Sequence, residues 1–257
     1  MRHRSIIPST KDLLPIAALL SRVVLPLFAA LALLAGLSAC TPNRASRSET
    51  PSRAHTKPAA TPHSEPLAAN AGGFDYYLLV LSWAPEFCAT HESNRSSSEC
   101  DPTRHFGFVV HGLWPQNDDG SYPKDCGNAQ PVSNEMMREL LPLMPARGLI
   151  QHEWSTHGTC TGLSAQAYFG QLQQLYQSLK IPDEYQHPST AFSAKPGDLE
   201  QKFAHANGAP QSAFRASCSG GEFVAIEACF DKNLKYRDCG SSLRDCRAPQ
   251  VKVLPVP

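Results

Sequence analysis

The stretch Asp75-Tyr-Tyr-Leu-Leu-Val-Leu-Ser-Trp83 decides the fold, because it is the clearest strand pattern in the sequence. Its residues are almost all aromatic or large and apolar, and it lies between Gly72-Gly73 and Pro85. An apolar run of this length between turn-forming residues is typical of a buried β-strand. A second stretch of the same kind, residues 105–111, predicts another strand that ends at Gly112.

Helical patterns follow these two strands, and further strand patterns follow the helices. Ser133 and Ser164 stand where N-caps are expected, and Pro142 and Gly158 are typical helix-ending residues. This order of elements predicts an α+β domain with a mainly antiparallel central sheet and flanking helices. The predicted helices cover residues 133–141, 150–157, 164–179 and 196–206, and the predicted later strands cover residues 212–217 and 222–230.

The N-terminal residues 1–39 have the layout of a signal peptide for export. Basic residues such as Arg4 and Arg22 precede an apolar stretch over residues 23–37. That stretch contains Pro26 and is shorter than the roughly 20 apolar residues that a membrane-spanning helix needs. It fits the apolar region of a signal peptide, and a transmembrane anchor is the less favoured alternative.

The end of this apolar stretch, Leu37-Ser-Ala-Cys40, resembles the cleavage motif of bacterial lipoproteins. The resemblance implies that Cys40 becomes the lipid-bearing first residue of a mature periplasmic or secreted protein. Thr41, in place of an acidic residue, favours the outer membrane. Residues 40–73 are rich in Pro, Ser and Ala and are expected to form a disordered tether. The folded domain is predicted over residues 74–257.

The cysteine count also supports export. Of the nine cysteines, eight remain once Cys40 is assigned to the lipid, and these lie between Cys88 and Cys246. An even number of cysteines in an exported domain predicts four disulfides. No two cysteines have the Cys-x-x-Cys spacing of zinc ribbons, so a structural metal site is not expected.

The chain is close to neutral, with 23 basic and 23 acidic residues, and it becomes slightly acidic once residues 1–39 are removed. A protein that grips duplex DNA through many phosphates is usually basic. The composition therefore argues against tight, sequence-reading DNA binding. An enzyme that contacts only a few nucleotides is compatible with it.

Two segments carry most of the candidate chemistry: Phe108-Val-Val-His111-Gly-Leu-Trp-Pro-Gln116 and His152-Glu-Trp-Ser-Thr-His157-Gly-Thr-Cys160. RNA is cleaved by its own 2′-hydroxyl when one group removes that proton and another protonates the departing 5′-oxygen. Imidazole, with an ordinary pKa of about 6.5, does either near neutral pH. An additional cationic donor helps, because the pentacovalent phosphorane carries extra negative charge.

Two other interpretations of these histidines stay open at this level. A single histidine at the end of a strand is more often structural than catalytic, and the chain has 10 histidines. Zinc binding is the second, because His152, Glu153 and His157 lie close together in the sequence. Zincins place their histidines four residues apart on one helical face, whereas a spacing of five turns His157 roughly 140° away from His152. Helical pitch thus predicts no metal site here.

Together the two segments resemble the paired active-site motifs of the ribonuclease T2 family, His-Gly-Leu-Trp-Pro and His-Glu-Trp-x-x-His-Gly-x-Cys. The likeness covers roughly residues 74–248 and is strongest toward the bacterial periplasmic branch. It implies a ribonuclease T2-like fold and an endoribonuclease that needs no cofactor or metal. The expected reaction on single-stranded RNA gives a 2′,3′-cyclic phosphate, which is hydrolysed more slowly to a 3′-phosphate.

The resemblance also assigns roles to individual residues. His157 matches the base that takes the 2′-hydroxyl proton, and His111 matches the acid that protonates the leaving oxygen. His152 matches a histidine that contacts the phosphate, and Glu153 matches a carboxylate that orients or polarises the site.

Trp114, Trp154 and Thr156 are further candidates for substrate contact. The tryptophans are candidates for base stacking, although packing is the alternative for both. Thr156 stands where the family usually has a lysine that stabilises the phosphorane. Losing one such donor commonly lowers the rate by about 10²–10³. A slow enzyme is therefore expected, unless Lys124 or an arginine fills the place.

The resemblance selects one disulfide pattern from the 105 pairings that eight cysteines allow. The expected partners are an RNA substrate and, through the lipid, a membrane, with the protein itself a monomer. Two alternatives from other classes remain: a catalytically weak lipoprotein of the same fold that binds RNA or protein, and an envelope scaffold or inhibitor whose histidines are structural. The implied disulfides are Cys88–Cys100, Cys126–Cys160, Cys218–Cys246 and Cys229–Cys239.

Overall fold

The computed structural model describes residues 73–90 and 97–257 of the chain. The predicted signal peptide, Cys40 and nearly all of the predicted tether therefore lie outside the described residues. The described residues all fall within the second of two units of the chain, His63–Pro257. Among them, no helix combines the length and the apolar character that crossing a membrane requires.

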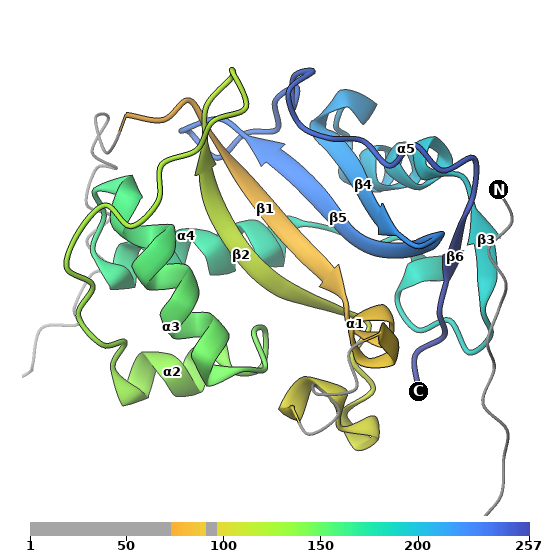
Figure 1. Cartoon of the computed structure of the whole chain (residues 1–257), viewed down its shortest axis with the longest axis horizontal. Coiled ribbons are helices and arrows are strands. Elements are labelled where there is room, and N and C mark those ends of the chain that lie inside the picture. The colour runs from red at the N-terminus through yellow and green to blue at the C-terminus, as the bar shows by residue number, and fades with distance from the viewer. Residues whose placement is uncertain (1–72, 91–96) are drawn as a thin grey trace, which may run out of the picture. The chain divides into compact units, whose positions relative to one another are not determined.

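A six-stranded sheet forms the centre of this part of the chain (Figure 1). β1 pairs antiparallel with β2 on one side and with β5 on the other, and β4 pairs antiparallel with β5. β3 pairs antiparallel with β6, and β6 runs parallel to β5. The predicted α+β fold with a mainly antiparallel sheet is confirmed. The strands are β1 (Tyr76–Trp83), β2 (Phe108–Gln116), β3 (Phe192–Ala194), β4 (Phe214–Ser219), β5 (Glu222–Phe230) and β6 (Val251–Val253).

Helices accompany the sheet largely where the sequence predicts them. Ser133 and Ser164 cap α2 and α4 as expected, because their hydroxyl oxygens accept hydrogen bonds from the N–H groups of Met136 and Ala167. α3 begins earlier than predicted and ends before His157. The described α-helices are α1 (Ala84–Thr90), α2 (Asn134–Leu140), α3 (Arg147–Thr156), α4 (Ala165–Ser178) and α5 (Pro196–Asn207).

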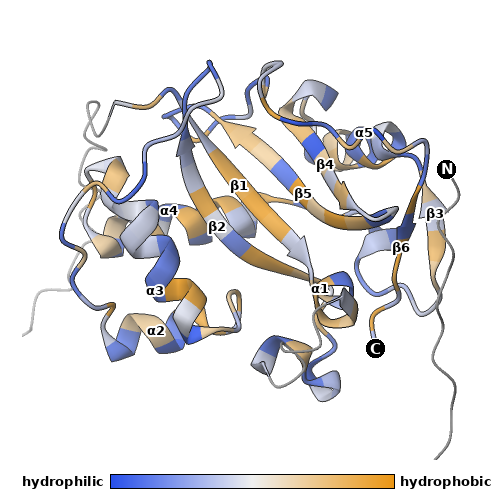
Figure 2. Cartoon of the chain, in the orientation of Figure 1, coloured by the Kyte–Doolittle hydropathy of each residue, from blue (hydrophilic) through white to orange (hydrophobic). Residues whose placement is uncertain are grey.

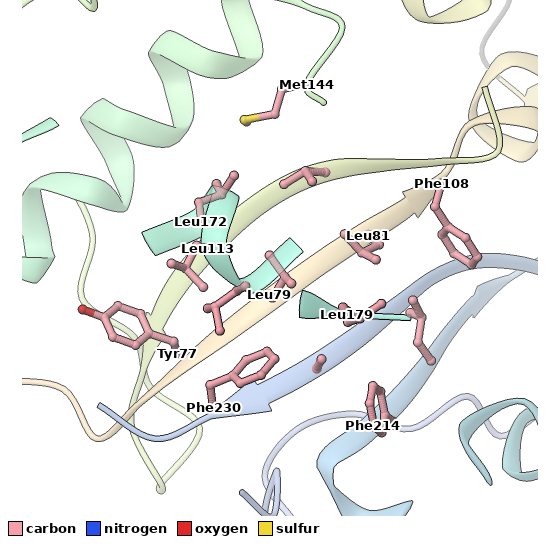
Figure 3. Packing of buried hydrophobic residues seen from close by; sticks show 14 of the residues in the cluster. Tyr77, Leu79, Leu81, Phe108, Leu113, Met144, Leu172, Leu179, Phe214 and Phe230 are labelled. Carbon is pink, nitrogen blue, oxygen red and sulfur yellow. The ribbon is translucent and has the colours of Figure 1, made fainter. Parts of the chain in front are cut away.

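The two faces of the sheet are buried in different ways. On β1, the side chains of Tyr77 and Leu79 belong to the main hydrophobic core, whereas those of Leu78 and Val80 belong to a smaller cluster on the opposite side. The first side, called here the covered face, packs against residues of α2, α3, α4 and α5 in the main core. Figure 3 shows part of this core, including Tyr77, Leu79 and Leu81 of β1. The other side, called here the open face, is covered in part by residues 239–243. The middle of β1 is strongly hydrophobic, in keeping with its central place in the sheet (Figure 2).

Two predicted strand boundaries are wrong. The strand predicted over residues 105–111 is β2, which begins at Phe108 and continues through Gly112 to Gln116. It accommodates Pro115 because β2 is an edge strand, where a missing N–H breaks no ladder. β4 begins later than predicted, because residues Gln211–Ala213 form a 3₁₀ turn.

His111 is an extra residue in β2. Residues 80–81 of β1 face Gly112 and Val110, so His111 has no residue opposite it and forms a β-bulge. The bulge changes the phase of the strand, and Val110 and Leu113 consequently both pack in the main core. His111 therefore lies in the middle of an edge strand rather than at a strand end.

All four disulfides implied by the family resemblance are present. Cys229–Cys239 and Cys218–Cys246 fasten the chain that follows β5 to β5 and β4. Cys126–Cys160 joins the loop after β2 to the turn after α3, and Cys88–Cys100 closes a local loop after β1.

Candidate active site

The two motif segments meet at the edge of the sheet, where α3 packs beside β2. The indole Nε1 of Trp114 donates a hydrogen bond to Glu153 Oε2 at 2.7 Å. A β-carbon on Gly112 would lie 1.9 Å from the same oxygen. Only glycine at this position of β2 therefore leaves room for the carboxyl group that arrives from α3.

Glu153 is the most buried polar group of the site, with 1% of its side chain exposed. Burial raises the pKa of Glu153 to about 8, and the hydrogen bond from Trp114 offsets this only in part. Its other oxygen, Oε1, is 3.7 Å from His111 Nε2. Whether a shared proton is on the carboxyl group or on the imidazole, the pair has no net charge. With a pKa of about 8, the carboxyl group of Glu153 holds that proton near neutral pH and contacts His111 as a neutral partner that orients the ring.

His111 presents an accessible imidazole that its neighbours orient. Ser82 Oγ is 3.1 Å from His111 Nδ1. The ring meets Trp114 edge to face at a centroid distance of 5.6 Å, and 41% of the side chain is exposed. Partial burial of the ring, which disfavours the charged form, lowers the pKa of His111 below its ordinary value, and the neighbouring His152 adds to this shift.

His157 directly follows α3, and its ring stacks at a tilt on that of Trp114 with 5.2 Å between centroids. The side chain is buried, and its Nδ1 atom has no hydrogen-bond partner within the described residues. Burial lowers the pKa of His157 to about 4, helped by His152 and His111 and opposed by Asp125. His157 is therefore a neutral imidazole, and a proton acceptor, at neutral pH.

His152 and Thr156 occupy the exposed side of the site, one helical turn apart on α3. Thr156 Oγ1 lies 3.5 Å from His152 Nδ1, and the His152 ring centre is 6.4 Å from that of His157. The Asp125 N–H donates to the Thr156 carbonyl at 2.8 Å, which holds the preceding loop against the end of α3. Lys124, in that loop, is exposed and remains a candidate for the missing cation.

The prediction that helical pitch turns His157 away from His152 is wrong. Ligand atoms of His152, Glu153 and His157 lie within 4.8 Å of one another. α3 ends at Thr156, and His157 directly after it has φ −111° and ψ −46°, so the regular rotation of the helix does not extend to this residue. Imidazole and carboxylate are suitable ligands for zinc. The fit is nevertheless poor, because burial favours the protonated carboxyl group of Glu153 and Trp114 already donates to one of its oxygens.

Trp154 belongs to the hydrophobic core rather than to an exposed surface. It is buried, and its ring lies 5.9 Å from that of Tyr168. A β-carbon on Gly158 would lie 2.4 Å from the Trp154 ring, so this glycine serves packing. The buried position of Trp154 therefore favours its packing role over base stacking. Trp114, in contrast, is partly exposed between His111 and His157.

Tyr122 is a site residue that the sequence analysis missed. It is 50% exposed, and within the described ranges it is the only large hydrophobic side chain with such exposure. Its ring centre lies 6.3 Å from that of His157. Arg237 Nη2 donates to Asp118 Oδ1, and Ser242 Oγ donates to the Asp118 carbonyl, each at 2.8 Å, so the C-terminal segment holds this loop. An aromatic residue alone in a polar loop was the only sequence signal.

The geometry provides two imidazoles in different environments on either side of Trp114. One is buried and neutral, and the other is accessible beside the carboxyl group of Glu153. A proton acceptor and a proton donor at neighbouring positions are the requirements of general acid–base catalysis. The fold and the site thus define an α+β protein with a paired-histidine acid–base centre.

Comparison with known proteins extends this assignment. The model of the ribonuclease T2 family matches residues 74–239, which is more than half of the chain and includes both motif segments. The chain belongs to the ribonuclease T2 family.

Several curated ribonucleases are similar in sequence. Ribonuclease DdI of Dictyostelium discoideum is 32% identical over 191 residues, covering 67% of this chain and 81% of that protein. A ribonuclease of Aeromonas hydrophila is 40% identical over 126 residues, and a probable ribonuclease of Haemophilus influenzae is 38% identical over 122 residues. These two matches cover 49% and 43% of this chain, and 56% and 45% of the relatives. The chain therefore spans about half the length of these two bacterial proteins.

Solved structures share the fold at lower sequence identity. An RNase-related protein from Calystegia sepium has a TM-score of 0.56 and 23% identity, covering 71% of this chain and 97% of that one. RNase NT in complex with 5′-AMP has a TM-score of 0.52 and 21% identity, covering 71% and 98%. Likeness at this level establishes the fold.

Proposed function

We propose that this chain is an endoribonuclease that cleaves single-stranded RNA by attack of the 2′-hydroxyl on the adjacent phosphate. The observation that carries the proposal is the pairing of a buried, neutral His157 with an accessible His111 that is backed by Glu153. Membership of the ribonuclease T2 family supports the same reaction.

In the first step, His157 accepts the 2′-hydroxyl proton while the 2′-oxygen bonds to phosphorus. The bond between phosphorus and the 5′-oxygen breaks, and His111 donates a proton to that oxygen. The products are a 2′,3′-cyclic phosphate and a 5′-hydroxyl. In the second, slower step the roles reverse: water attacks the cyclic phosphate, His111 takes its proton, and His157 protonates the 2′-oxygen to leave a 3′-phosphate.

Other residues of the site contact the substrate. His152 is exposed beside His157 and binds the phosphate, with Thr156 orienting its ring. The exposed ring of Tyr122 and the neighbouring Trp114 flank His157 and offer a surface for the base on the 5′ side of the cleaved bond. Stacking of this kind requires an unpaired base, which favours single-stranded RNA.

RNA digestion by the purified full chain in the presence of EDTA tests the proposal. The expected result is cleavage at an unchanged rate, with cyclic phosphate ends appearing before 3′-phosphate ends. Loss of cleavage in EDTA would contradict the two-histidine mechanism. RNA binding without cleavage would favour the catalytically weak binding protein, for which Thr156 is the supporting observation. Neither binding nor cleavage would favour a scaffold or inhibitor with structural histidines.

The proposed location is the bacterial cell envelope, through a lipid on Cys40 and a tether over residues 40–73, with the protein a monomer. The supporting observations are the Leu37-Ser-Ala-Cys40 sequence and the pairing of all eight other cysteines in disulfides. Mass spectrometry of the mature N-terminus is expected to find an acylated Cys40, and Cys40→Ser to release or mislocalise the protein. Recovery of residues 1–39 on the mature membrane-bound form would contradict the assignment.

A further inference from the structure

We propose that a cavity beside Arg244 and Arg247 binds a backbone phosphate of the RNA downstream of the cleaved bond. The proposal rests on the ribonuclease activity proposed above and adds a second contact to it. The cavity has a volume of about 580 Å³ and lies where the C-terminal segment passes β4. Its lining residues are Ser217, Cys218, Arg244, Asp245, Cys246 and Arg247.

The charge of the cavity suits an anion. Within residues 73–90 and 97–257, neither Arg244 nor Arg247 has an ion-pair partner. Asp245, the acidic residue of the lining, pairs with Arg215, whose Nε lies 2.7 Å from its Oδ1. Two guanidinium groups therefore remain free to bind, and arginine matches the oxygens of a phosphate with two parallel hydrogen bonds. The Cys218–Cys246 disulfide fixes the backbone that carries them.

The cavity lies on the same face of the sheet as His111. Ser82, whose Oγ contacts His111, faces Ala225 in the neighbouring strand β5, and Ala225 in turn faces Ser217 in β4. Side chains of directly paired residues lie on one face of a sheet. This row of paired residues therefore leads from the imidazole to the lining of the cavity, across the open face.

The distance fits a short length of RNA. His111 lies on β2 and the lining residue Ser217 lies on β4, with β1 and β5 between these strands. Three steps of about 4.8 Å from strand to strand give a span of about 14 Å. A stacked strand has one phosphate per about 3.4 Å, so about four nucleotides cover this span, and an extended strand needs fewer.

The direction follows from the proton transfers. His111 protonates the leaving 5′-oxygen in the proposed mechanism, so the RNA on the 3′ side of the cleaved bond departs next to His111. Tyr122 lies on the other side, against His157. The open face beyond His111 is therefore the path of the 3′ part of the substrate.

Oligonucleotides that contain one ribonucleotide, followed by one to six deoxynucleotides, test this subsite. Only the bond after the ribonucleotide is cleavable, because the other sugars lack the 2′-hydroxyl. For the full chain, kcat/KM is expected to rise about tenfold once the 3′ part reaches the arginines, the size of one charge-assisted hydrogen bond. In Arg244→Gln/Arg247→Gln this rise is expected to disappear, while the rate on the shortest substrate and the melting temperature stay unchanged.

The matched control is Lys180→Gln/Lys195→Gln, which removes two exposed positive charges beside α4 and α5 and keeps the rise. A rise that persists in the arginine variant, is absent in the unchanged protein, or falls equally in the lysine variant would overturn the subsite. If the arginine variant keeps the rise but no longer binds phosphatidylglycerol vesicles that the unchanged protein binds, the cavity is assigned to lipid phosphate instead. If the unchanged protein cleaves none of the substrates, the proposed function itself fails.

Discussion

The two faces of the central sheet show how one element supports both stability and chemistry. The covered face packs against four helices in the main hydrophobic core. The open face has only a small apolar cluster, and two disulfides, Cys229–Cys239 and Cys218–Cys246, hold the segment that crosses it. On that face the side chains of Ser82 and Trp114 do not pack against a helix and contact His111. Covalent links thus replace apolar packing where strand side chains are used for the site.

The largest expected effect is the loss of activity when either histidine of the pair is removed. His111→Ala and His157→Ala should each lower kcat/KM by about 10²–10⁴, the usual contribution of one acid–base group. The melting temperature of His111→Ala should not change, because this ring is half exposed on the open face. His205→Ala, an exposed histidine on α5, is the control. A fully active His111→Ala protein would show that the open face does not carry the acid.

A smaller gain is expected from restoring a cation at position 156. Thr156→Lys should raise kcat about tenfold, since one well-placed donor to the phosphorane is worth about 10²–10³ and an introduced side chain is less well oriented. The cyclic product should be unchanged. If Lys124 already provides the charge, Thr156→Lys will have no effect and Lys124→Ala will lower kcat instead. Single-turnover rates for both variants distinguish these outcomes.

A pair of glycine substitutions separates the two faces directly. Gly112→Ala places a methyl group against Glu153, and Gly158→Ala places one against Trp154. Overpacking of this kind typically costs about 1–3 kcal/mol. Gly112→Ala should displace Glu153 and lower kcat/KM severalfold, whereas Gly158→Ala should mainly lower the free energy of unfolding measured with urea. Equal effects of both substitutions on activity would mean that the core side and the site are not separable.

The weakest effect concerns pH. His157 must be neutral to accept a proton, and its pKa is lowered to about 4, so the rate should fall only as the pH drops toward this value. His111 must be protonated to act as the acid, and its pKa is lowered from the ordinary 6.5. As the pH rises, the rate should therefore begin to fall before neutral pH is reached. The plot of kcat/KM against pH should be bell-shaped with an acidic maximum. A maximum above pH 7 would contradict these environments.

Local signals allowed much of the fold to be predicted from the sequence. The Ser133 and Ser164 caps and the apolar stretch of β1 are encoded by neighbouring residues, and the structure confirms them. The course of β2 beyond His111 was not predictable in this way, because Gly112 and Pro115 normally end a strand. The edge position of β2 makes Pro115 acceptable, and the carboxyl group of Glu153 requires a glycine at position 112. Both causes are tertiary contacts that the local sequence does not encode.

The candidate site shows the same division. The family resemblance gave the disulfide pairing, which cysteine spacing alone left open. The approach of His157 to His152 depends on where α3 ends, and the helix ends at Thr156, one residue before the predicted boundary. Tyr122 reaches the site only because the C-terminal segment holds its loop, a contact between residues more than a hundred positions apart.

The bulge in β2 has a consequence for how this segment tolerates change in length. Side chains of an ordinary strand alternate, and one extra residue at His111 lets Val110 and Leu113 both reach the core. Deleting His111 would leave Val110 and Leu113 two residues apart, so regular alternation would keep both side chains in the core. Inserting one further residue while the bulge is kept would instead turn one half of the strand inside out. The sheet itself therefore tolerates the loss of this residue, and the extra residue in β2 serves the site rather than the packing of the strand.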